Sequence, residues 1–72
     1  MTPTIREYER IRAVLAEADT ESLTAHEILT RLEERDVDVE SAHRVATVLG
    51  RRAERGEIEV VHDDPYRYRL AG

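Results

Sequence analysis

Residues 41–70 read SAHRVATVLGRRAERGEIEVVHDDPYRYRL, and this stretch decides the fold because its periodicity changes from that of a helix to that of a strand. Over residues 41–55 the apolar side chains recur three and four positions apart, within a sector of about 100° on a helical wheel. This spacing predicts a helix with a buried face of Ala42, Val45, Ala46, Leu49 and Ala53. The opposite side of the helix carries Arg44, Thr47, Arg51 and Arg55.

Two alternating runs follow this helix. Apolar residues alternate with glutamates over residues 57–60, and after Asp63-Asp64-Pro65 the tyrosines and Leu70 alternate with two arginines. Period-2 runs around a short polar segment predict a β-hairpin with a three-residue turn. On the outward face of the hairpin, Glu57 and Glu59 are expected to pair across the strands with Arg67 and Arg69. We expect the three tyrosines of the chain to serve mainly in packing.

Two glycines have expected roles in or after the helix of residues 41–55. Gly50 lies inside it and destabilises a helix by about 1 kcal/mol relative to alanine, so we expect it to allow the close approach of another helix. Gly56 is expected to end the helix in the left-handed conformation.

Upstream of residue 41 the pattern predicts two further helices. The first covers about residues 4–18, with a Thr4/Glu7 capping box and apolar residues at spacings of three and four: Ile5, Tyr8, Ile11, Val14, Leu15 and Ala18. A polar connection, residues 19–23, has room for a very short strand. Thr24 then caps a second helix that runs to about Arg35, with Glu27 completing a capping box and Leu23 packing on Ile28. Asp38, Glu40 or Ser41 could cap the third helix.

Length and composition favour one small domain over residues 1–72. No apolar run approaches the roughly 20 residues that cross a bilayer, and no secretory leader opens the sequence. We therefore expect a cytoplasmic protein with no membrane association. The absence of cysteine excludes disulfides and thiolate metal sites.

The charged residues are unevenly distributed. The chain has a net charge of −5, and all eleven basic residues are arginine. Residues 17–40 carry nine acidic residues and two arginines, whereas residues 41–56 carry four arginines and one glutamate. An acid-rich, lysine-free composition is typical of proteins from salt-adapted archaea, and a GC-rich genome is the alternative explanation. The arginine-rich helix is the functional lead.

Sequence patterns for catalysis and for metal binding are missing. There is no glycine-rich phosphate loop, nucleophile elbow or HExxH motif. His26, His43 and His62 lack metal-ligand spacing, and acidic pairs such as Glu33-Glu34 are typical of solvated surfaces. We therefore expect neither an enzyme nor a bound cofactor or metal.

The segment from Val45 through Val60, closed by residues 65–70, resembles the recognition helix and wing of archaeal and bacterial winged helix-turn-helix regulators. Thr24–Leu29 resembles the opening of their second helix, and the similarity covers about residues 4–70. The resemblance implies an α+β winged-helix fold, a three-helix bundle with a C-terminal β-hairpin wing. It also implies a small transcriptional regulator that binds duplex DNA, with a homodimer as the expected assembly.

The same resemblance implies DNA-contacting residues. Base edges in the major groove would face Ser41, His43, Arg44 and Thr47. Arg51, Arg52 and Arg55 would contact phosphates. The wing arginines, Arg67 and Arg69, are also candidates for phosphate contact, but cross-strand pairing is the preferred expectation for them. Departing from the family pattern, Asp63 and Asp64 occupy the wing tip, and the pI is about 5.1. The alternative function is a protein-interaction module with the same fold, whose arginine face docks an acidic partner or lies inside a larger complex. A third possibility is that the arginine face is solvated and pairs with Glu33 or Glu34.

Overall fold

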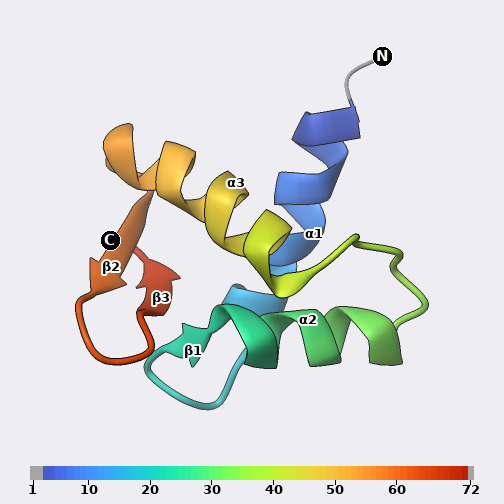
Figure 1. The fold of residues 1–72 in the computed structure, drawn as a ribbon, viewed down its shortest axis with the longest axis horizontal. Coiled ribbons are helices and arrows are strands. Elements are labelled where there is room, and N and C mark those ends of the chain that lie inside the picture. The colour runs from blue at the N-terminus through green and yellow to red at the C-terminus, as the bar shows by residue number, and fades with distance from the viewer. Residues whose placement is uncertain (1–2, 72) are drawn as a thin grey trace.

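The computed structural model describes residues 3–71 of the chain, with side chains described from Arg6 onward. Its elements are α1 (Pro3–Glu17), β1 (Leu23–Thr24), α2 (Ala25–Glu34), α3 (Ala42–Glu54), β2 (Ile58–Val61) and β3 (Arg67–Leu70). The described chain is therefore a small α+β domain with three helices and one three-stranded antiparallel sheet. Figure 1 shows the β2–β3 hairpin at the end of the molecule opposite the connection between α2 and α3.

The first helix begins and ends one residue earlier than the sequence pattern predicts. Tyr8, Ile11, Val14 and Leu15 are buried, as their spacing indicates. The predicted Thr4/Glu7 capping box and the packing of Ile5 lie outside the described side chains. Glu7 contacts Arg44 of α3, as described below.

The second helix starts with the predicted capping box. The Thr24 hydroxyl accepts the Glu27 backbone N–H at 3.1 Å, and the Glu27 carboxylate accepts the Thr24 N–H at 2.8 Å. These reciprocal bonds satisfy two backbone donors that the helix itself leaves open. Leu23 and Ile28 are both buried.

The C-terminal end of α2 closes with Asp36 at a φ of 59°. The Val37 N–H donates to the Leu32 carbonyl at 2.9 Å, and the Asp36 N–H donates to the Glu33 carbonyl at 3.1 Å. This pair of bonds is a Schellman motif, which turns the chain toward α3. Val37 then packs against the core.

The third helix is capped by Ser41, one of the three residues that the sequence allowed. The Ser41 hydroxyl accepts the Arg44 backbone N–H at 3.2 Å. At the other end Gly56 has a φ of 81°, and its N–H donates to the Ala53 carbonyl, which confirms the predicted left-handed cap. The role predicted for Gly50 is wrong, because a Cβ at that position would meet nothing within 4 Å.

The sheet has the order β1-β3-β2, so the last strand of the chain lies in the middle. Glu59 faces Arg69 and Val60 faces Tyr68 across the hairpin, and Leu23 faces Tyr68 on the other side. The loop spans residues 62–66, which corrects the predicted three-residue turn. Tyr66 lies in this loop with 52% of its surface exposed and meets the His62 ring edge-to-face at 5.0 Å, so it lies outside the core to which Tyr8 and Tyr68 belong.

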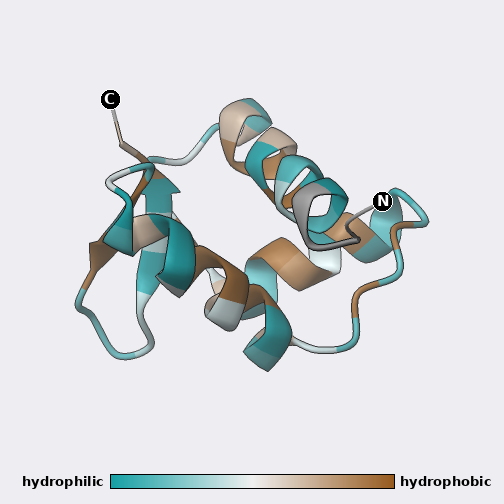
Figure 2. Cartoon of the chain, turned by 90° about the horizontal axis from the view of Figure 1, so that it is seen from above, coloured by the Kyte–Doolittle hydropathy of each residue, from teal (hydrophilic) through white to brown (hydrophobic). Residues whose placement is uncertain are grey.

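Twelve side chains from all six elements form one core, which contains ten aliphatic residues and two tyrosines. Among the described residues no charged side chain is buried. The helices in Figure 2 alternate between hydrophobic and hydrophilic residues along their length, as expected of helices that cover a core with one face. The described residues contain no helix with both the length and the hydropathy required to cross a bilayer.

Candidate nucleic-acid interface

The side of α3 opposite its buried face carries mostly exposed residues. His43, Arg51 and Arg55 are exposed on it, and Thr47 is half-buried. The Thr47 hydroxyl donates to the His43 backbone carbonyl at 3.0 Å, a bond that leaves its oxygen free to accept. Among the described residues Arg51 and Arg55 form no ion pair, so their guanidinium groups are free for a partner.

Arg44 has a different environment. Its Nε donates to Oε1 of Glu7 at 3.0 Å, and its Nη2 lies 2.9 Å from the same oxygen. Glu7 hydrogen-bonds to the guanidinium and also raises the pKa of Arg44 through its charge. The pair joins α3 to α1, whereas the solvated alternative had expected partners on α2, at Glu33 or Glu34. Contact between Arg44 and a base requires this pair to open.

Arg52 points toward α1 instead of toward solvent. Its guanidinium carbon lies 4.1 Å from the centre of the Tyr8 ring, which is the geometry of a cation–π interaction. Its Nη1 lies 3.4 Å from Oε1 of Glu57, and only 19% of the Arg52 side chain is exposed. Burial raises the pKa of the Tyr8 hydroxyl, and the charge of Glu57 adds to that effect. The structure thus places Arg52 in the packing between α3, α1 and the hairpin, and not among the outward arginines.

The sequence held a signal for this placement. Arg52 lies seven residues after Val45 and three after Leu49, so all three fall in the same sector of the helix. A long arginine side chain can cover apolar surface with its methylene stem while its charged end reaches a partner at the edge. The position of Arg52 on the helical wheel, next to the buried residues, therefore indicates that its side chain points toward the core, whereas its charge alone suggested that it faces outward.

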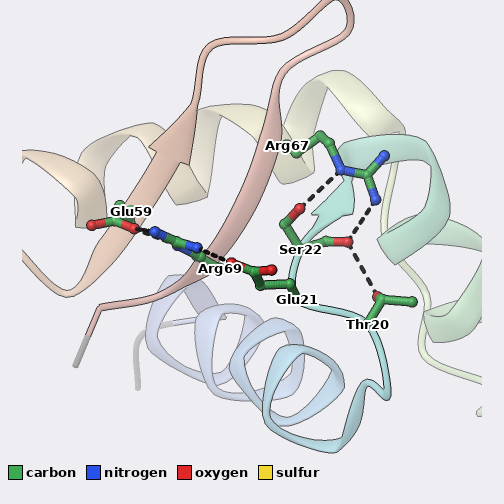
Figure 3. Close-up of polar contacts among 6 residues, drawn as sticks. All are labelled: Thr20, Glu21, Ser22, Glu59, Arg67 and Arg69. Carbon is green, nitrogen blue, oxygen red and sulfur yellow. Dashed lines mark hydrogen bonds and ion pairs between the residues drawn. The ribbon is translucent and has the colours of Figure 1, made fainter.

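The two wing arginines are held by neighbouring polar groups, as Figure 3 shows. Arg69 lies between Glu59, its cross-strand neighbour, and Glu21, whose Oε1 is 2.6 Å from Nη1. Hydrogen bonding to Glu59 and the charge of that carboxylate raise the pKa of Arg69. The preferred expectation of cross-strand pairing is confirmed for Arg69.

Arg67 binds the connection before β1, not a glutamate of β2. Its Nε donates to the Ser22 hydroxyl at 2.9 Å, and its Nη2 donates to the Ser22 carbonyl at 2.7 Å (Figure 3). The Thr20 hydroxyl donates to the same carbonyl at 3.2 Å, and Glu27 lies 3.8 Å from Nη2 of Arg67. These contacts tie the hairpin to the segment that leads into α2.

Acidic side chains interrupt the basic surface around α3. Glu54 is exposed seven residues after Thr47, on the same face of the helix. Glu57 follows the helix, and Asp63 and Asp64 are exposed in the hairpin loop. The outward arginines of α3 are therefore Arg51 and Arg55, and exposed acidic residues lie on the same helix face and in the hairpin loop.

The described residues include no group of three or more His, Cys, Asp or Glu side chains placed to hold a metal ion. Comparisons of the chain with protein-family models, with curated proteins and with solved structures gave no match.

Proposed function

We propose that this chain is a small winged-helix protein that binds duplex DNA as a transcriptional regulator, with α3 in the major groove. The observation that carries the proposal is the combination of topology and exposure. The element order α1-β1-α2-α3-β2-β3 with the sheet order β1-β3-β2 is compatible with the winged-helix arrangement. In this arrangement α3 buries Val45, Val48 and Leu49 and leaves its opposite side open. A major groove about 12 Å wide accepts a helix presented in this way.

Within this proposal the free side chains of α3 divide into two roles. His43, Thr47 and Arg51 follow one another at intervals of four residues along the open face and are placed for base edges. A guanidinium such as that of Arg51 can bridge the two major-groove acceptors of guanine. Arg55, at the end of the helix, is placed for a phosphate. Ser41, which already caps the helix, positions the first turn.

Arg44 and Arg52 have supporting roles in the proposal. Each fixes α3 against α1, through Glu7 and Tyr8 respectively. A recognition helix has to be held at a defined angle, because contacts to base edges depend on geometry. A homodimer in the cytoplasm would double the few contacts that one copy of α3 can make and would set the spacing of two half-sites.

The acidic side chains favour a second candidate, a protein-interaction module of the same fold. Glu54 on α3 and Asp63-Asp64 in the hairpin would lie against phosphates if the whole surface faced DNA. A protein surface of mixed charge would meet both signs favourably.

The experiment is a duplex-binding titration over a series of salt concentrations with three proteins. The variant R51A/R55A removes both outward arginines of α3, whereas R31A/R35A removes two arginines from α2 as a charge-matched control. Each phosphate contact contributes about 0.9 to the slope of log K against log salt. Because Arg55 is the one of the two arginines placed for a phosphate, R51A/R55A should reduce the slope by about 0.9, and the lost base contact of Arg51 should weaken binding further; R31A/R35A should leave the slope unchanged. Equal losses in both variants would leave only general electrostatics, and no binding by the wild type at any salt concentration would favour the protein-interaction module.

A further inference from the structure

A groove of about 480 Å³ runs between α1 and the connection from α2 to α3. Helix α1 contributes Arg6, Glu7 and Arg10, and Arg44 reaches it from α3. The connection contributes Asp36-Val37-Asp38-Val39. The volume falls within the range of pockets that hold small molecules in other proteins.

The groove brings together three kinds of surface. Arg6 and Arg10 are exposed one helical turn apart on α1, and neither has an ion-pair partner among the described side chains. Asp36 and Asp38 are exposed on the connection, again with no ion pair among the described residues. Val37 and Val39 alternate with these two aspartates along the chain. Both valines are half-buried and pack against the core, so they offer apolar surface to the groove.

The remaining two charges of the groove are already matched. The Glu7 carboxylate accepts from the Arg44 guanidinium at 3.0 Å, so neither of them requires a ligand. Among the described residues, the charges open to a ligand are therefore two cations from α1 and two anions from the connection. A ligand that satisfies both must carry both signs. It must also carry an apolar part to cover the valines.

We propose that this groove binds a free α-amino acid with an aliphatic side chain. Its carboxylate lies against Arg6 and Arg10, because a planar guanidinium matches the two oxygens of a carboxylate. Its ammonium group lies against Asp36 and Asp38, and its side chain covers Val37 and Val39. A simple anion would leave the aspartates unmatched, and an internal peptide segment would bring neither terminal charge.

The groove contains Arg44, which pairs with Glu7, but none of the four residues that the proposed function places on DNA, His43, Thr47, Arg51 and Arg55, lines it. The proposal therefore does not depend on the outcome of the duplex titration.

The experiment is a titration of the protein with L-leucine followed by amide resonances in NMR spectra. Leucinamide, which lacks the carboxylate, and N-acetyl-leucine, which lacks the ammonium group, are the matched ligands. L-leucine should shift the resonances of residues 6–10 and 36–40, and each matched ligand should bind about tenfold more weakly, the factor expected for losing one charge-assisted contact.

Two variants and two controls test the residues. R10Q and D38N should each weaken leucine binding about tenfold. R12Q, on α1, and D63N, in the hairpin loop, remove the same charges outside the groove and should change nothing. The proposal is overturned if leucine causes no shifts, if the shifts lie elsewhere, if acetate or methylammonium binds as well as leucine, or if the controls weaken binding as much as R10Q and D38N.

Discussion

Gly50 is the position at which the structure makes the sharpest prediction about stability. It lies inside α3, four residues from the end of the helix, where glycine destabilises a helix by about 1 kcal/mol relative to alanine. A Cβ at this position would meet nothing within 4 Å. The substitution G50A therefore adds a methyl group without a clash and reduces the conformational entropy of the unfolded chain. We expect G50A to stabilise the domain by about 0.5–1 kcal/mol.

Gly56 provides the matched control, because the same substitution there should have the opposite sign. Its φ of 81° lies in the left-handed region, where a Cβ costs about 1–2 kcal/mol. A domain of this size changes its melting temperature by about 4–8 °C for each kcal/mol. G50A should thus raise the melting temperature by about 2–8 °C, whereas G56A should lower it by about 4–16 °C.

The assay is urea unfolding followed by circular dichroism, with thermal melts of the same three proteins. An unchanged slope of free energy against urea would show that the substitutions act on stability and not on the extent of unfolding. A G50A protein less stable than the wild type would refute the reasoning, since it would mean that α3 packs against something at Gly50. Equal destabilisation by G50A and G56A would show that the two backbone environments are alike.

Three further predictions concern the caps and the inward arginine. Asp36 has a φ of 59° at the end of α2, so D36G should stabilise the domain by about 0.5–1 kcal/mol in urea unfolding, and destabilisation would contradict the Schellman cap. R52M keeps the stem over Tyr8 but removes the cation, and a loss of about 1 kcal/mol is expected in thermal unfolding, with R51M as the control that should change little. The hydrogen bond from the Thr24 N–H holds the pKa of Glu27 below its ordinary value of 4.5. The ionised Glu27 carboxylate therefore contributes its full stabilisation above pH 4.5, and this contribution is lost as the pH falls through the lower pKa of the folded state. In E27Q the free energy of unfolding should therefore fall less steeply as the pH is lowered below 4.5. A fall as steep as that of the wild type would contradict a stabilising role for the Glu27 charge.

The secondary structure of this chain was largely predictable because its local signals agree with one another. The Thr24/Glu27 capping box and the left-handed Gly56 depend on neighbouring residues, and the structure contains both. The alternation over residues 57–70 predicted the hairpin and cross-strand pairing of its glutamates with its arginines, which the structure contains for Glu59 and Arg69 but not for Arg67. Loop length was not predictable in this way, because strict alternation continues through Tyr66 although the ladder starts only at Arg67.

The site was less predictable because the direction of an arginine depends on contacts between distant elements. Arg44 meets Glu7, which lies 37 positions earlier in the chain, and no local pattern pairs the two. Arg52 meets the Tyr8 ring across the α1–α3 interface. The expectation that Gly50 allows a close helix contact was wrong for the same reason. A helical wheel gives the direction in which residue 50 points from the helix axis, but it does not show which other element lies in that direction.

The most direct test of the account is to locate a bound duplex on the protein surface by following amide and side-chain resonances in an NMR titration. The account predicts that the largest changes fall on α3 at His43, Thr47, Arg51 and Arg55, with only small changes in the acidic loop at residues 62–66. Changes concentrated in that loop or on α2, with α3 unaffected, would contradict the claim that the outward face of α3 is the contact surface.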